Sequence, residues 1–269
     1  MGEQWYVTVY GVRGSLPMAA ADFLEYGGNT SCVCVDYGRG LAIFDAGSGL
    51  TGLGGILAGR KDIRRLDLLL THLHLDHVMG LPGFAPLYEP DREIHLHGRA
   101  GFREQLASLL GNPWWPLELG DFPANLHFHE VEPGKSFCLA EPDGPVVSTL
   151  AGNHPGGSIL YRLDEGGRRV VYALDCEVRE EQEGLMAFAR DGSLLFWDAT
   201  FTPEDLREGW GHSTWEQGIA LGHAAGVRKV LMTHYYWGYT DSVLREQERL
   251  ARERDGSCCF AREGMVIKL

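Results

Sequence analysis

Four side chains that commonly bind metal ions follow one another closely in residues 71–77, Thr-His-Leu-His-Leu-Asp-His. The preceding residues 66–70 are almost continuously apolar, which predicts a short strand buried on both faces. If that strand ends near Thr71, His72 and His74 project to one side, and the leucines that follow each of them turn back into the core. Two imidazoles then face one point.

Asp76 and His77 follow where the backbone must turn, so their side chains can diverge and reach a second cation beside the first. Imidazole and carboxylate without thiolate suit zinc, manganese or iron, and the residue types alone do not choose among them. The segment therefore predicts a two-metal hydrolase. The alternative is a polar turn whose histidines only form hydrogen bonds.

The strands expected to position these residues come in groups that are interrupted by helical patterns, which favours two sheets packed face to face with helices outside. Strand-like runs lie at residues 5–10, 32–35, 41–44, 66–70, 93–96, 146–150, 158–163, 169–174, 194–197 and 227–232. Helical patterns lie at residues 49–58, 100–110, 180–189, 214–224 and 242–254. His95, His97, His127 and His129 alternate along strand-like segments and are interpreted as surface or cross-strand residues.

The composition fits one globular domain over residues 1–269, with 44% hydrophobic residues and no linker. The formal net charge is −13, and no basic block offsets it, so a long nucleic acid or an anionic membrane surface is not expected as a partner. A compact anionic substrate held by metal ions remains compatible. No signal peptide or membrane-spanning run is visible, so a cytoplasmic location is expected, and a homodimer is left open.

One expected helix start carries a further histidine. Ser213 stands three residues before Glu216, the spacing of a capping box, which places His212 immediately before the first turn. The positive end of the helix dipole disfavours a protonated imidazole there, so His212 needs an acidic neighbour to act as an acid. Asp198, at the end of an apolar run, is the candidate neighbour. Alternatively, His212 only accompanies the cap and Asp198 is an ordinary strand-end carboxylate.

With these residues in view, the chain resembles the metallo-β-lactamase fold superfamily, whose signature His-x-His-x-Asp-His matches residues 72–77. The resemblance implies a four-layer αββα sandwich of two mixed sheets flanked by helices, and two divalent metal ions, with zinc expected and manganese or iron as alternatives. Asp45 resembles the strand-end aspartate that orients the metal loop without binding metal. The implied ligands are His72, His74 and His154 on one ion, Asp76, His77 and His234 on the other, and Asp175 between them.

Within the superfamily, the chain is most similar to the branch that contains ribonuclease Z and bacterial cyclic-nucleotide phosphodiesterases. Gly-His-Ser-Thr at residues 211–214 and Asp-Ala-Thr at residues 198–200 carry this similarity. The segment at residues 11–30 resembles the branch's N-terminal loop, which approaches the metals. Departures are the missing Gly- and Lys-rich arm of the transfer-RNA-processing members and the sequence after His234, which lacks their Ser-Pro-Arg. These departures and the net negative charge of the chain favour a small phosphodiester as substrate.

The resemblance implies hydrolysis by a hydroxide held between two cations roughly 3.5–4 Å apart. Protonation of the leaving alkoxide is assigned to His212, oriented by Asp198. The expected catalytic residues are thus Asp76, His212 and Asp198, and the candidate substrate contacts are Asn29, Tyr236 and Trp237. The alternatives are a ribonuclease Z-like RNA-processing endonuclease, a thioester or lactone hydrolase, and a non-enzymatic ligand-sensing domain on the same scaffold.

Overall fold

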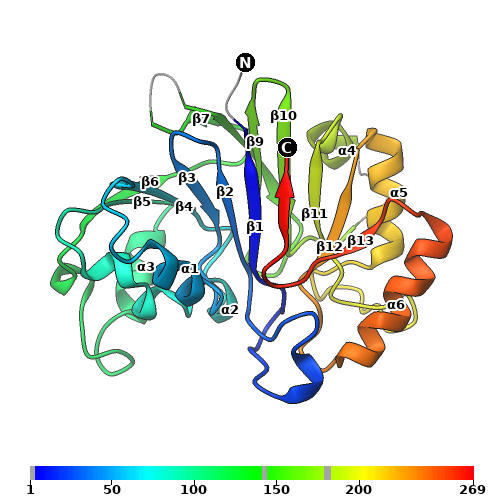
Figure 1. Cartoon of the computed structure of the whole chain (residues 1–269), viewed down its shortest axis with the longest axis horizontal. Coiled ribbons are helices and arrows are strands. Elements are labelled where there is room, and N and C mark those ends of the chain that lie inside the picture. The colour runs from blue at the N-terminus through cyan, green and yellow to red at the C-terminus, as the bar shows by residue number, and fades with distance from the viewer. Residues whose placement is uncertain (1–3, 141–143, 179–182) are drawn as a thin grey trace.

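Two seven-stranded sheets pack face to face in the middle of the computed structural model, which describes residues 4–140, 144–178 and 183–269. Helices cover both outer faces, so the described residues form four layers in the order helix, sheet, sheet, helix (Figure 1). Each sheet contains parallel and antiparallel pairs. The predicted αββα sandwich of two mixed sheets is confirmed.

The first sheet is antiparallel at one side and parallel at the other. Its order is β14 (Val266–Lys268), β1 (Tyr6–Gly11), β2 (Cys32–Asp36), β3 (Leu41–Phe44), β4 (Arg65–Leu69), β5 (Glu93–Gly98) and β6 (Asn125–Glu130). The strands from β3 to β6 run parallel to one another. Three leucines of β4 are buried, in keeping with the near-continuous apolar run in its sequence.

The second sheet is likewise antiparallel at one side and parallel at the other. Its order is β13 (Cys259–Phe260), β12 (Val230–Thr233), β11 (Leu194–Asp198), β10 (Arg168–Ala173), β9 (Ser158–Glu165), β8 (Val146–Gly152) and β7 (Ser136–Cys138). The strands from β10 to β13 are parallel. Inner faces of the two sheets meet in one apolar core, where the rings of Phe44 and Tyr172 stack with centroids 4.9 Å apart.

Helices on each side bury apolar faces against their own sheet (Figure 1). The first sheet is covered by α1 (Leu50–Leu57), α2 (Leu75–Val78) and α3 (Phe102–Leu109), and the second by α4 (Glu183–Ala189), α5 (Trp215–Ala225) and α6 (Asp241–Arg254). Short 3-10 turns are η1 (Ala21–Phe23), η2 (Leu81–Gly83), η3 (Ala85–Tyr88) and η4 (Leu119–Asp121). None of the helices in the described ranges is long and apolar enough to cross a membrane.

The predicted elements differ from the observed ones mainly at their ends. The strand at residues 41–44 is reproduced, whereas the one predicted at residues 227–232 begins at Val230. Strands β7, β13 and β14 and helix α2 were not predicted, because they are too short to show a period, and β6 was indicated only by the alternation of His127 and His129. The helix predicted at residues 180–189 is present from Glu183 onward, and residues 180–182 lie outside the described residues.

Candidate metal centre

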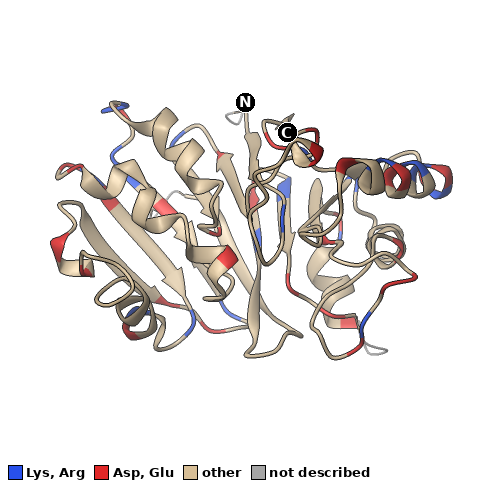
Figure 2. Ribbon diagram, turned by 90° about the horizontal axis from the view of Figure 1, so that it is seen from below, with Lys and Arg blue, Asp and Glu red and all other residues tan. Residues whose placement is uncertain are grey.

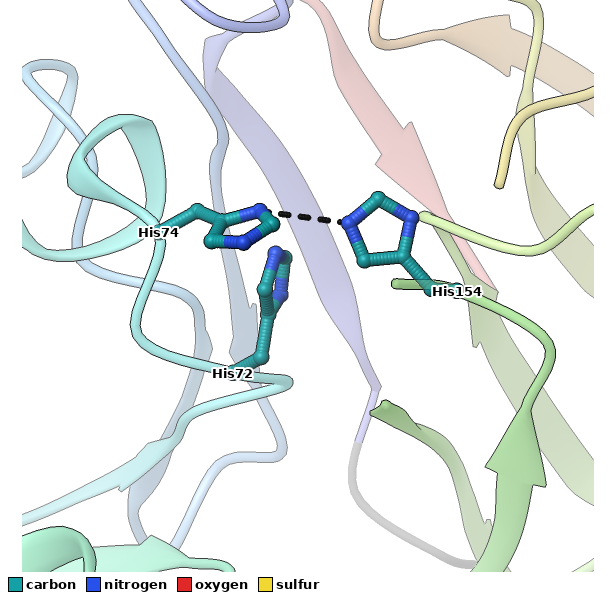
Figure 3. Close-up of side chains that lie close together, drawn as sticks. All are labelled: His72, His74 and His154. Atoms are coloured by element: carbon teal, nitrogen blue, oxygen red, sulfur yellow. Dashed lines mark hydrogen bonds between the residues drawn. The ribbon is translucent and has the colours of Figure 1, made fainter. Parts of the chain in front are cut away.

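Three histidines from two different sheets meet at one rim of the sandwich (Figure 3). His72 and His74 follow β4, and their ring centroids lie 4.3 Å apart. His154 follows β8, and its Nε2 lies 3.2 Å from Nδ1 of His74. Because β4 already ends at Leu69, the two neighbouring histidines lie on a loop and not on a continuing strand.

The predicted return of both leucines to the core is wrong for Leu75. Its side chain is 58% exposed because Leu75 opens α2, where the chain has left the sheet. His74 takes the N-cap position of that helix in an extended conformation. The short helix therefore directs the next two residues of the motif, Asp76 and His77, inward, where both are buried.

A second group consists of Asp76, His77 and His234. Nε2 of His77 lies 3.2 Å from Nε2 of His234, and Oδ2 of Asp76 lies 3.4 Å from each of these two nitrogens. Two nitrogens bound to one tetrahedral zinc, each at 2.0–2.1 Å, lie about 3.3 Å apart. The observed separations therefore match the donor spacing of a metal site.

The carboxylate of Asp175 lies between the two groups. Its Oδ1 is 3.6 Å from Nε2 of His154, and its Oδ2 is 3.1 Å and 3.2 Å from Nε2 of His77 and His234. Burial alone would raise the pKa of Asp175, but His234, His77 and His72 hold it well below the usual range, so the group is an ionised acceptor. One carboxylate oxygen faces each group.

The donor set fits divalent metal ions. Nε2 of His72 is buried and has no hydrogen-bond partner among the described residues, which is costly unless a cation occupies its lone pair. Burial, and secondly the neighbouring His77, lower the pKa of His72 well below its usual value, so the ring is a neutral donor. Together the structure gathers all seven predicted ligands: His72, His74, Asp76, His77, His154, Asp175 and His234.

Three of the site residues hold left-handed backbone conformations within two residues of the ends of strands in the parallel halves. The φ angles are 57° at Asp45, 52° at Asp175 and 60° at His234. Such values are uncommon outside glycine and cost free energy, so they are kept where the surrounding structure requires a particular side-chain direction. The sharp turns aim side chains from β3, β10 and β12 at one rim of the sandwich.

Two threonines, to which the sequence analysis gave no role of their own, fix the imidazole orientations. The hydroxyl of Thr71 donates to Asp45 at 2.9 Å and lies 3.0 Å from Nδ1 of His72. The hydroxyl of Thr200 donates to Asp198 at 2.6 Å and lies 2.9 Å from Nδ1 of His234. Because each hydroxyl proton goes to a carboxylate, the hydroxyl oxygen accepts the Nδ1 proton, which leaves Nε2 as the metal-directed atom.

Asp45 orients a third imidazole and is fully buried. Its Oδ2 accepts the Nδ1 proton of His77 at 2.7 Å, and its Oδ1 accepts the backbone N–H of Thr71 at 2.8 Å. This placement agrees with the supporting role expected for Asp45.

The N-terminal loop reaches the same rim. The backbone N–H of Ser15 donates to Oδ2 of Asp76 at 2.6 Å. A Cβ at Gly14 would lie 2.6 Å from a ring carbon of His234, so only glycine allows this close approach. The sequence indicates that the loop containing Ser15 approaches the metals, but it does not indicate the contact of Ser15 with Asp76.

His212 and Asp198 form a hydrogen-bonded pair beside the ligand set. Nδ1 of His212 lies 2.9 Å from Oδ2 of Asp198, and the His212 ring centroid is 5.1 Å from that of His154 and 5.3 Å from that of His234. Burial alone would lower the pKa of His212, but Asp198 and then Asp175 outweigh it and raise the pKa to about 9. The pair can therefore carry a proton at neutral pH.

The predicted helix cap is displaced by one residue. The N-cap is Thr214, whose hydroxyl accepts from the backbone N–H of Gln217, and Gln217 completes the capping box. Ser213 instead donates its hydroxyl proton to the carbonyl of Cys176. His212 thus lies one residue further from the helix than expected. The loop that contains it is held by contacts other than the helix cap. The Glu177 carboxylate accepts from two backbone N–H groups of that loop, those of Gly209 and Gly211, at 2.9 Å each.

The candidate substrate contacts lie in different surroundings. Trp237 is 36% exposed and Tyr236 is half-buried, and their rings lie 5.1 Å apart just after His234. The side-chain amide of Asn29 donates to Glu263 at 2.9 Å and accepts from Ser48 at 3.0 Å, so both of its polar atoms are already used within the protein. All three contacts stay predictions.

A small cavity adjoins the histidines that follow β4. It has a volume of about 290 Å³, and its lining includes His72, His74, Arg99, Phe102 and Gln105. This volume is near the lower end of the roughly 300–1,000 Å³ found for small-molecule sites. The rim therefore offers space for a compact group beside the ligand set.

Comparisons with known proteins agree with this fold and identify the family. Residues 43–235 match the family described as Beta-lactamase superfamily domain. A ribonuclease Z from Bradyrhizobium sp. (strain ORS 278) is 30% identical over 72% of this chain and 80% of that protein. The chain belongs to the beta-lactamase superfamily of metal-dependent hydrolases, in its ribonuclease Z-like branch.

Solved structures show the same fold at low sequence identity. The metallo-beta-lactamase fold protein YhfI from Bacillus subtilis has a TM-score of 0.78 and is 20% identical, with 99% of this chain and 100% of that chain covered. The short form of human tRNase Z has a TM-score of 0.70 and is 19% identical, with 97% and 98% covered. At these identities the likeness extends to the fold alone.

Proposed function

We propose that this hydrolase is a phosphodiesterase that binds two divalent metal ions, with zinc the expected metal. The observation that carries the proposal is Asp175, whose two oxygens face two separate groups of donors. The first ion would be held by His72, His74 and His154, the second by Asp76, His77 and His234. When bound, a pair of such ions lowers the pKa of a water molecule and offsets charge on phosphoryl oxygens.

The residues around the ions supply position and proton transfer. Asp45, Thr71 and Thr200 hold three imidazoles with Nε2 directed inward. The pair of His212 and Asp198 stands ready to donate a proton from Nε2 of His212, because Nδ1 is already engaged by Asp198 at 2.9 Å. An alkoxide leaving group needs that proton, which supports a phosphodiester over the thioester alternative, where a thiolate leaves more readily.

A small diester is the first candidate substrate. The net charge of −13 opposes binding of a long polyanion, and Lys and Arg residues are interspersed with Asp and Glu over the described ribbon, as on α6 (Figure 2). The cavity of about 290 Å³ beside His74 suits one compact group. RNA is the second candidate, because the 30% identical relative is named ribonuclease Z.

The acid role of His212 is tested by comparing two substrates. His212→Ala should lose about 10²–10⁴ in turnover of a cyclic nucleotide, whose leaving group is an alkoxide, and much less with bis(p-nitrophenyl) phosphate, whose leaving group needs no proton. The metal content should stay unchanged. His223→Ala, at an exposed histidine in the last turn of α5, is the matched control and should behave as wild type.

Equal losses of turnover by His212→Ala on both substrates would exclude the acid role of His212. Cleavage of a precursor transfer RNA in preference to every small diester would make RNA the substrate. A wild-type enzyme that hydrolyses thioesters but no phosphodiester would overturn the proposed reaction.

A further inference from the structure

The cavity of about 290 Å³ beside His72 and His74 has a positively charged side chain in its wall. It is lined by residues of the loop after β5 and of the loop after β8, which carries His154. Arg99 is the single Lys, Arg, Asp or Glu residue among the described residues that line it. In a chain with a formal net charge of −13, a cavity without carboxylates next to the candidate metal ligands favours an anionic occupant.

Backbone carbonyls of the loop after β8 hold the Arg99 side chain in place. Its Nη1 donates to the carbonyl oxygen of Gly156 and, at 2.7 Å, to that of Gly157. Gly157 has a φ of 79°, and a Cβ there would lie 2.5 Å from Nη1 of Arg99, so glycine leaves room for the guanidinium. The guanidinium is therefore fixed beside the candidate metal ligands before any substrate binds.

Most of the hydrogen-bonding capacity of this guanidinium is unused. A guanidinium has five N–H donors, and those of Nη1 already serve the two glycine carbonyls. The donors on Nε and Nη2 have no hydrogen-bond or ion-pair partner among the described residues, and the side chain is exposed. Such a planar fork matches the two oxygens of a carboxylate or phosphate.

We infer that Arg99 binds a second anionic group of the substrate, a carboxylate or phosphate separate from the diester at the metal centre. The inference rests on the proposed function, because it places the diester at the candidate metal ligands. Gln105, exposed near the start of α3, also lines the cavity and offers an amide to the same group. The substrate is therefore a small diester with an anionic end, and the cavity distinguishes it from a neutral diester of equal size.

Three non-hydrolysable probes separate this role from hydrolysis. Propylphosphonate and 3-phosphonopropionate share a three-carbon chain and a metal-binding phosphonate, but only the second has a terminal carboxylate, and 1,2-ethylenediphosphonate has a second phosphonate instead. Their affinities for the zinc-loaded full chain are measured by isothermal titration calorimetry with wild type, Arg99→Gln and Arg103→Gln. Arg103 is the matched control, because it is exposed on α3 with its guanidinium carbon 5.2 Å from the ring centroid of Phe128, and it does not line the cavity.

We expect wild type to bind at least one of the two doubly anionic probes about 10–100-fold more tightly than propylphosphonate, the gain expected for hydrogen bonds to a charged group. Arg99→Gln should lose this preference while its affinity for propylphosphonate stays within a few-fold of wild type, and Arg103→Gln should keep the preference. The probe that binds more tightly identifies the second group as carboxylate or phosphate.

Equal or undetectable binding of all three probes by wild type overturns the inference, and so does a preference that survives in Arg99→Gln. An equal loss of affinity for every probe in Arg99→Gln also overturns it, because Arg99 would then only hold the loop after β8. Since binding is measured without turnover, a wild type that cleaves no diester would refute the proposed function and leave this test decisive.

Discussion

Replacement of Asp45 by asparagine tests whether the orienting hydrogen bonds matter for metal binding. Asp45 is fully buried and accepts protons from Nδ1 of His77 and from the backbone N–H and hydroxyl of Thr71. Asparagine tolerates the left-handed conformation at this position, where φ is 57°, so the backbone need not change. The amide, however, has one oxygen for these donors, and its NH₂ group must face one of them.

The expected loss follows from these contacts. A hydrogen bond to a charged group contributes about 1.5–3 kcal/mol, and removal of a partner that orients a ligand lowers metal affinity about 10–100-fold. That range corresponds to about 1.4–2.8 kcal/mol, so the two magnitudes agree. Asp45→Asn should therefore bind metal about 10–100-fold more weakly, while turnover at saturating metal changes less.

The assay is competition for zinc against a chromophoric chelator, with circular dichroism to check the fold. Thr71→Ser serves as the control, since it keeps the hydroxyl that bridges Asp45 and His72. Its affinity should stay within a few-fold of wild type. If Asp45→Asn held zinc as tightly as wild type, the assignment of His77 orientation to this carboxylate would be wrong.

Two further predictions concern the loop before α5 and the anchoring of α6. A Cβ at Gly211 would lie 2.3 Å from Nδ1 of His154, so Gly211→Ala should lower turnover at least tenfold. Gly209 also has a positive φ, but a Cβ there would face open space, so Gly209→Ala should reduce stability without lowering turnover. Burial alone would raise the pKa of Glu248, but Arg262 and Tyr26 lower it, so its ionised form adds stability at neutral pH that is lost as the pH falls below about 4. The free energy of unfolding of Glu248→Gln, measured by denaturant titration, should thus be about 1.5–3 kcal/mol lower than that of wild type at pH 7. The difference should shrink in acid.

The metal motif was predictable because its donors are close in sequence and follow a clear apolar strand. The helix cap was harder, because Ser213 and Thr214 are both good N-cap residues and each has Glu or Gln three positions later. The choice is decided by the contact of Ser213 with the carbonyl of Cys176, 37 residues earlier. Such a contact cannot be inferred from local spacing.

The supporting contacts depend on pairings that only the folded chain creates. Glu177 reaches backbone groups 32 and 34 residues away, and Thr71 reaches a carboxylate 26 residues away. The four histidines on β5 and β6 were interpreted as surface or cross-strand residues, and two of them, His95 and His97, are buried. Their burial follows from the face of β5 that meets the second sheet, which alternation alone does not identify.

Orientation of the donors before any ion binds explains why the rim tolerates strained backbone. Left-handed conformations at Asp45, Asp175 and His234 each cost about 1–3 kcal/mol. Hydrogen bonds of Thr71 and Thr200 with carboxylates and imidazoles offset part of that cost and fix the direction of the rings. Because the rings are already directed, less conformational entropy is lost when a cation binds. The strained backbone at the strand ends thus increases the affinity of the rim for metal ions.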